Sequence, residues 1–66
     1  MFGVIKWFSP IKGYGFIERA DGPDIVFFRS DIWGQFEPSI GMRVAFEAVC
    51  GDRGIVAKQV RAVDPA

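Results

Sequence analysis

The chain has 66 residues, half of them hydrophobic, and this length predicts a single domain over 1–66 with a short tail at 64–66. Eight cationic side chains balance eight anionic ones, so a strongly basic nucleic-acid binder is excluded and any such binding has to use a local patch. One cysteine and no histidine exclude an internal disulfide, a cysteine metal cluster and the commonest general base.

No apolar run in the sequence is long enough to cross a membrane, and no signal peptide is visible. We therefore expect a cytoplasmic protein with no cofactor, no metal and no membrane partner. The chain also holds seven Phe, two Trp and one Tyr. In a core this small, exposed aromatic rings are costly unless they have a function.

Five short segments rich in β-forming residues follow one another, separated by turns that contain glycine or proline. Pro10 ends the first segment because proline cannot donate a ladder hydrogen bond. A helical turn at 30–32, capped by Ser30, and a loop at 33–40 follow the third segment. No stretch shows a sustained 3.6-residue apolar period, so the pattern predicts a small all-β barrel or sandwich. The predicted strands cover 2–8, 14–19, 24–28, 42–49 and 55–63, with turns at 20–23 and 50–54.

The stretch at 12–17, Lys-Gly-Tyr-Gly-Phe-Ile, places two aromatic residues two positions apart. In a strand this spacing directs Tyr14 and Phe16 to one face, and Gly15 and Ile17 to the other. Gly15 leaves room behind the rings for another backbone, and Ile17 can serve the core. A flat aromatic surface of this kind suits stacked bases. The alternative is that both rings line the core of an ordinary strand.

The same parity sorts the third predicted strand, in which Ile25 and Phe27 share one face while Val26 and Phe28 share the other. Only one of these faces can line the core of a small barrel. Either Phe27 or Phe28 should therefore be exposed.

Lys6, Trp7 and Phe8 are consecutive in the first predicted strand. Strict alternation puts Lys6 and Phe8 on one face and Trp7 on the other, but a bend or bulge near 9–10 would bring Trp7 to the same surface. The alternative for Trp7 is a buried core indole. Lys6, Lys12 and Arg29 would surround the rings with positive charge; the alternative is that each is an ordinary solvated charge.

Three motifs, taken in this order, resemble the bacterial cold-shock domain family: Gly-Val-Ile-Lys-Trp-Phe at 3–8, Lys-Gly-Tyr-Gly-Phe-Ile at 12–17 and Asp-Ile-Val-Phe-Phe-Arg-Ser-Asp-Ile at 24–32. The resemblance covers essentially the whole chain. It implies a five-stranded antiparallel barrel of the oligonucleotide/oligosaccharide-binding (OB) type, with single-stranded RNA or DNA bound on the aromatic face of the first three strands. The resemblance implies contacts from Lys6, Trp7, Phe8, Tyr14, Phe16, Phe28 and Phe36, and the basic rim adds Lys12 and Arg29.

Several positions depart from the family pattern. Ser9 stands where the family usually has Asn, Val26 where it has Phe, and Phe28 where it has His. One stacking ring is thus lost and another gained, which shifts the ring surface along the strand. Ile-Val at 55–56 replaces a common Pro-Gln, so aliphatic surface takes the place of a polar base contact. Trp33 is not a family residue; it either adds a ring at the rim or packs against the bottom of the barrel.

The predicted function is sequence-tolerant binding of single-stranded nucleic acid by stacking, carried out by a monomer acting as an RNA chaperone or a regulator of transcription or translation. The alternative is a peptide-binding barrel in which Trp7, Tyr14 and Phe28 form an aromatic groove for a proline-rich ligand. We expect no enzyme and no small-molecule substrate, because histidine, a nucleophile elbow, a phosphate-binding loop and a clear carboxylate pair are all missing. Asp21 and Asp24 are expected to make local turn hydrogen bonds.

Overall fold

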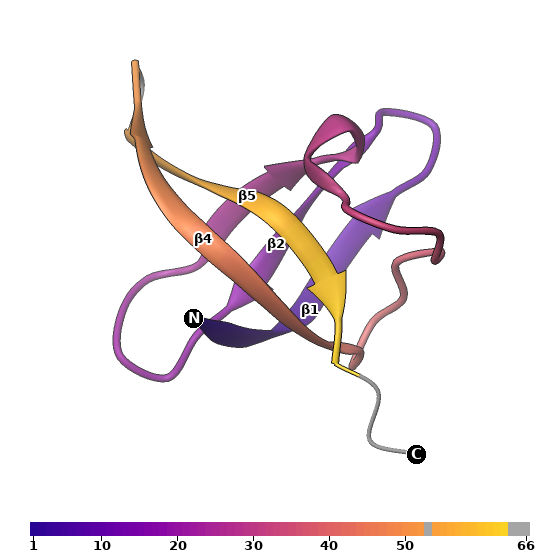
Figure 1. The fold of residues 1–66 in the computed structure, drawn as a ribbon, viewed down its shortest axis with the longest axis horizontal. Helices are drawn as coiled ribbons and strands as arrows, with labels where there is room; N and C mark the ends of the chain where they lie inside the picture. Colours follow the sequence, from indigo (N-terminus) through magenta and orange to yellow (C-terminus); the bar gives the residue numbers. More distant parts are fainter. Residues whose placement is uncertain (53, 64–66) are drawn as a thin grey trace.

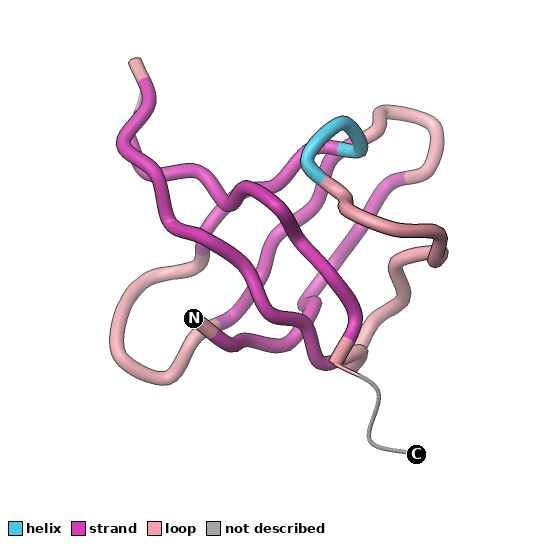
Figure 2. The backbone as a smooth tube through the Cα atoms, viewed as in Figure 1, coloured by secondary structure: helices cyan, strands magenta, loops and turns pink. Residues whose placement is uncertain are grey.

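The computed structural model describes residues 1–52 and 54–63, which form five strands, one short helical turn and the loops between them. Figure 2 shows strands crossing the middle of the molecule, with loops along its sides and the helical turn at the upper right. The elements are β1 (Phe2–Ser9), β2 (Tyr14–Glu18), β3 (Ile25–Phe28), the 3₁₀ turn η1 (Arg29–Asp31), β4 (Arg43–Gly51) and β5 (Gly54–Ala62).

The strands close into a barrel in the order β1-β2-β3-β5-β4, and β4 returns to β1. In Figure 1, β4 and β5 cross in front of β1 and β2. Every junction is antiparallel except that between β3 and β5, which is parallel and rests on the single pair Val26 and Val56. The predicted five-stranded OB-type barrel is confirmed, with this parallel junction as its one exception to antiparallel pairing.

The core lies between the walls of the barrel and is filled from alternate strand positions. Ile17 and Phe27 are fully buried, as parity predicted for their faces, and Phe28 is 45% exposed on the outside. The prediction that only one of the two adjacent phenylalanines is exposed is therefore confirmed. The other members of the core are Ile5, Ile25, Val44, Phe46, Ala57 and Val60.

The largest difference from the predicted strand boundaries lies in the hairpin between β4 and β5. The sequence predicted a turn at 50–54, but the ladder continues through the pairs Cys50–Ile55 and Gly51–Gly54. Gly54 has φ +122°, a conformation that glycine adopts without steric cost. The hairpin therefore extends further than its glycine-rich sequence suggested. Residue 53 and the predicted tail at 64–66 lie outside the described residues.

The helical turn η1 is capped in a different way from the prediction. It covers Arg29–Asp31 rather than 30–32, and the acceptor is the carboxylate of Asp31 rather than the hydroxyl of Ser30. The backbone N–H of Phe28 donates to Asp31 Oδ2 at 3.0 Å, and Lys58 Nζ lies 2.9 Å from Asp31 Oδ1. This buried carboxylate therefore ties the end of β3 to β5.

Candidate nucleic-acid interface

A β-bulge in β1 sets the direction of Trp7. Ile5 pairs with Ile17 and Trp7 pairs with Phe16, so β1 has one more residue than β2 between these pairs. The extra residue is Lys6, and as a result Lys6 and Trp7 both point outward while Phe8 turns toward the core. The expected bulge is thus present, but it lies at Lys6 rather than near 9–10. The alternative of a buried indole at Trp7 is wrong.

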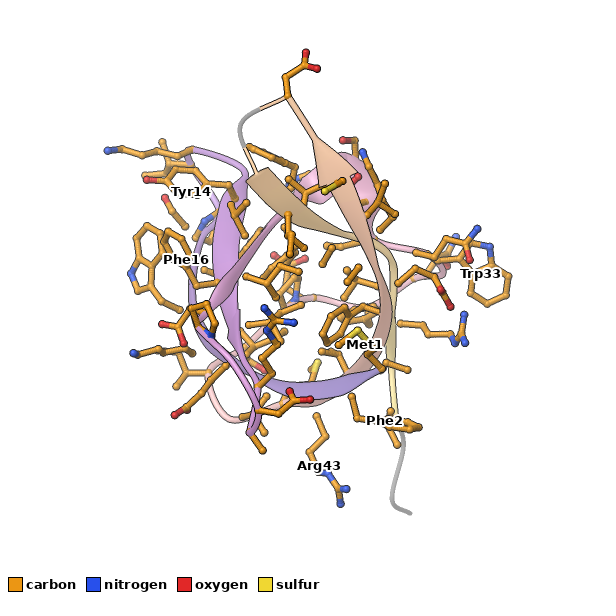
Figure 3. All side chains as sticks on the ribbon, turned by 90° about the vertical axis from the view of Figure 1, so that its left-hand side faces the viewer. Met1, Phe2, Tyr14, Phe16, Trp33 and Arg43 are labelled. Carbon is orange, nitrogen blue, oxygen red and sulfur yellow. The ribbon has the colours of Figure 1, made fainter. Side chains whose placement is uncertain are left out.

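Four side chains on the outer face of β1–β3 form a contiguous cluster, called here the aromatic platform: Trp7, Tyr14, Phe16 and Phe28. The ring centroid of Trp7 lies 5.4 Å from that of Tyr14 and 6.0 Å from that of Phe16. Tyr14 lies 6.0 Å from Phe16 and 6.3 Å from Phe28. In Figure 3, Tyr14 and Phe16 project side by side from the same wall of the barrel.

Tyr14 packs edge-on against Trp7 and Phe16 and tilted against Phe28, whereas Trp7 and Phe16 are stacked with 30° between their planes. Each ring keeps part of its surface open to solvent. Trp7 and Phe28 are exposed, and Tyr14 and Phe16 are half-buried. Each exposed ring face can accept a planar base, and stacking of one base on one aromatic ring is worth about 1–3 kcal/mol. The geometry therefore favours a flat, unpaired ligand that is held mainly through its bases.

Aliphatic side chains continue the platform beyond β2. Phe16 pairs with Val26 of β3, Val26 with Val56 of β5, and Val56 with Val49 of β4. Residues that are directly opposite on adjacent strands share a face, so Trp7, Phe16 and the three valines form one row around the barrel. The aliphatic replacement at 55–56 was expected from sequence. Val49 was missed, because only the pairing register brings it to this row.

Phe8 and Arg29 form a separate pair beside the platform. The Phe8 ring stacks on the buried Phe27 ring at 5.6 Å between centroids, with 14° between their planes. The Arg29 guanidinium lies over the same Phe8 ring, with its Cζ 5.3 Å from the ring centroid. Arg29 also donates to the carbonyl oxygen of Pro10 at 3.1 Å. The structure does not join Phe8 to the platform rings, and a direct role of Phe8 in binding stays a prediction.

The basic rim is only partly free to meet phosphates. Lys6 Nζ lies 3.0 Å from Asp24 Oδ2. The sequence predicted that Asp24 would bond within its own turn, but its carboxylate pairs across the sheet instead. The hydrogen bond from Lys6 to Asp24, and then the charge of Asp24, raise the pKa of Lys6. A raised pKa keeps the Lys6 ammonium protonated at neutral pH, and the positive charge of Lys6 is lost only in alkali. Lys12 is exposed in the turn before β2.

Two aromatic residues of the loop after η1 lie away from the platform. Phe36 is half-buried and packs against the hydrophobic core, and no ring pair within the described residues links it to the platform. Its predicted role as a contact residue stays a prediction. Trp33 is 64% exposed, so it does not pack against the bottom of the barrel. Figure 3 places it on the opposite side of the molecule from Tyr14 and Phe16, away from the predicted rim.

Replacing Val26 by phenylalanine is expected to tighten binding of an oligothymidine. Val26 stands next to Phe16 in the row, and an added ring would give one more base a stacking surface, worth about 1 kcal/mol at the low end of base–aromatic stacking. Fluorescence titration of the variant and the parent checks this. Unchanged or weaker affinity with an intact fold would mean that Phe28 or Arg29 already occupies the space.

The described residues offer little to other kinds of chemistry. Within them, no group of three or more histidine, cysteine or carboxylate side chains could hold a metal ion, and no cavity opens into the barrel. No helix of the described segments has the length and hydropathy of a membrane-spanning segment. The features that remain are an open aromatic surface and its basic neighbours.

A small closed barrel that carries clustered, outward-facing rings on three adjacent strands defines the class of OB-fold nucleic-acid-binding proteins. Comparison with known proteins agrees, since the model of the 'Cold-shock' DNA-binding domain matches residues 1–63. The chain belongs to the cold-shock domain family, whose members bind nucleic acid and are not enzymes.

Curated relatives match nearly end to end. The cold shock-like protein CspC of Bacillus cereus is 44% identical over 62 residues, covering 91% of this chain and 95% of the relative. The major cold shock protein CspA of Pseudomonas aeruginosa is 42% identical over 64 residues, covering 92% and 91%. Among solved structures, Drosophila Unr CSD456 superposes with a TM-score of 0.78 at 19% identity, covering 97% of this chain and 26% of that chain. That likeness supports the fold alone.

Proposed function

We propose that the protein binds single-stranded RNA or DNA with little base preference, by stacking unpaired bases on the aromatic platform. The observation that carries this proposal is the contiguous cluster of four rings on the outer face of β1–β3. Every base has a flat aromatic face, so stacking tolerates any sequence. Membership of the cold-shock domain family supports nucleic acid as the ligand.

In this mechanism the protein melts weak secondary structure by mass action. A strand whose bases stack on the platform is lower in free energy than the free strand, so paired segments open without ATP and without a covalent step. Lys12 and Arg29 lie near the platform and would follow the phosphates. Such an activity suits an RNA chaperone or a regulator of transcription or translation.

We further propose that the active species is a cytoplasmic monomer. All four rings of the platform come from one chain, so no second subunit is needed to complete it. Cys50 is free and exposed, which fits a compartment that keeps thiols reduced. Light scattering in the absence and presence of oligonucleotide tests the monomeric state.

A single-stranded heptamer is expected to bind at least about tenfold more tightly than a duplex of the same sequence, because the rings need bases that are unstacked and accessible. The measurement is a titration of tryptophan fluorescence with oligothymidine and with duplex, and with a proline-rich peptide as a further ligand. Equal affinity for single strand and duplex would contradict stacking. Tighter binding of the peptide would favour the alternative of a peptide-binding barrel.

Neutral net charge leads to a second expectation for the same titration. Each neutralised phosphate steepens the dependence of affinity on salt, and Lys6 is already paired with Asp24. We therefore expect a shallow salt dependence for the platform. A slope that requires many phosphate contacts would assign most of the affinity to charges instead of rings.

A further inference from the structure

A second outward-facing row lies on the side of the barrel formed by β4 and β5. Phe2 of β1 pairs with Ala45 of β4, and Ala45 pairs with Arg61 of β5. Ile32 forms a parallel bridge with Val60, and the Trp33 N–H donates to the Val60 carbonyl oxygen at 2.7 Å. Since Val60 is inside the barrel, the next residue on each segment, Arg61 and Trp33, lies outside and side by side.

This row exposes two large aromatic side chains around a small residue. Phe2 is 70% exposed and Trp33 is 64% exposed, whereas Ala45, which lies between Phe2 and Arg61 on the outer face, is only 8% exposed. Two long side chains flank this covered alanine in the row, Phe2 on one side and Arg61 on the other. The row therefore presents a continuous surface rather than isolated side chains.

Positive charge dominates around this row. Arg43 and Arg61 are both exposed on the outer face, and no carboxylate in the described part of the chain lies within ion-pairing distance of either. Of the acids on the neighbouring segments, Asp31 is bound to the Lys58 ammonium. Glu47 lies opposite Lys58 in the sheet register and makes no ion pair within the described residues. Aromatic rings beside arginines that make no ion pair within the described residues match the chemistry of a single strand, which offers both bases and phosphates.

We propose that Phe2, Trp33, Arg43 and Arg61 form a second contact surface for single-stranded nucleic acid, called here the far surface. Figure 3 shows Phe2 and Trp33 on the opposite side of the molecule from Tyr14 and Phe16, so the two surfaces cannot hold the same few nucleotides. The inference rests on the proposed function, because it assigns the same ligand class to a different face. One molecule would then hold two segments of strand at once and bring them together.

The position of the two tryptophans permits a separate readout for each surface. Trp7 is in the platform and Trp33 is in the far surface, and the chain has two tryptophans in all. In Trp7→Phe, fluorescence reports on Trp33 alone, and in Trp33→Phe it reports on Trp7 alone. Both variants are titrated with oligothymidine heptamer. We expect quenching in both. The Trp33 midpoint should lie at a higher oligothymidine concentration and depend more on salt, since the far surface has fewer rings and two arginines that make no ion pair within the described residues.

Charge-removal variants connect the Trp33 response to the far surface itself. Adding Arg43→Ser and Arg61→Ser to Trp7→Phe should raise the quenching midpoint of Trp33 at least tenfold. The same two substitutions in Trp33→Phe should leave the Trp7 midpoint unchanged. As the reciprocal control, Phe16→Ala should weaken the Trp7 response and leave the Trp33 response in place. Circular dichroism of each variant confirms that the barrel remains folded.

Two outcomes would overturn the far surface while leaving the platform intact. The first is a Trp33 emission that does not respond to oligothymidine at concentrations that saturate Trp7. The second is a Trp33 emission that changes with protein concentration in the absence of oligonucleotide, which would mean that a second copy of this chain covers the surface. Absence of a Trp7 response in Trp33→Phe would instead contradict the proposed function.

Discussion

Replacing Phe16 by alanine should weaken the binding of oligothymidine about ten- to a hundredfold and leave the barrel folded. The ring supplies a stacking face on the outer side of β2, and its loss removes roughly 1–3 kcal/mol of binding free energy. Phe16 also contacts Trp7 and Tyr14, and aromatic pairs contribute about 0.5–1.5 kcal/mol each. The low end of this range applies to rings that stay partly exposed, so the two pairs together predict a loss of stability of about 1 kcal/mol beside the loss of binding. Oligothymidine titration and thermal melting measure the two effects.

The neighbouring Ile17 supplies the matched control. It is fully buried in the core, so Ile17→Ala should reduce the free energy of unfolding by about 2–5 kcal/mol. It carries no ring, and the protein that remains folded should still bind at near-parent affinity. The reverse pattern, with Phe16→Ala unfolded and Ile17→Ala stable, would mean that the two faces of β2 are assigned the wrong way round.

A second large effect is expected for Gly15→Ala, which should destabilise the fold by about 1–3 kcal/mol or more. A Cβ at Gly15 would meet the backbone carbonyl oxygen of Trp7, and it would lie 2.9 Å from Phe8 Cα and 3.0 Å from the Phe27 ring. Two of these neighbours are backbone atoms of the adjacent strand, so relief requires β1 to move away from β2. Urea denaturation measures the loss.

Gly22→Ala is the comparison variant for this prediction. The three atoms nearest to a Cβ at Gly22 all belong to the Arg19 guanidinium, at 3.0 Å or more, which is the far end of a flexible side chain rather than backbone. Its stability should remain within about 0.5 kcal/mol of the parent, as for most exposed substitutions. If Gly15→Ala and Gly22→Ala are equally mild, β1 and β2 do not approach as closely at Gly15 as described.

The faces of β2 and β3 could be predicted from sequence because side chains alternate strictly along a regular strand. Tyr14 and Phe16 were therefore separated correctly from Ile17, and Phe27 from Phe28. The face of each strand that carries Ile17 or Phe27 has to be buried, because the barrel would otherwise have no core. In a short, regular strand, the order of the residues is therefore enough to predict which aromatic side chains face outward.

The direction of Trp7 could not be predicted in the same way. A bulge adds one residue to one strand, and Lys6, which is the added residue, has no feature that marks it. Pro10 is the residue that most clearly predicts a break in the strand, so the bulge was expected near 9–10, whereas it lies at Lys6. The direction of Trp7 depends on how β1 pairs with β2, which is not a local property of the sequence.

Contacts between residues on strands that are distant in the sequence could not be predicted from the sequence either. The salt bridge between Lys6 and Asp24 crosses β2, and the position of Val49 in the row depends on the pairing of β5 with both β3 and β4. Neither pairing has a sequence signature, because closure of the barrel brings these strands together. The extent of the interface is thus a property of topology, whereas its rings could be identified one strand at a time.

The most direct test of base stacking is the proton NMR spectrum of oligothymidine heptamer bound to the protein. Bases stacked on the rings of Trp7, Tyr14 and Phe16 should show upfield shifts of their H6 and methyl protons, because protons above an aromatic ring are shielded. They should also show intermolecular nuclear Overhauser effects to the ring protons of these three residues. Binding without upfield shifts, and with contacts confined to lysine and arginine side chains, would contradict the aromatic platform as the binding surface.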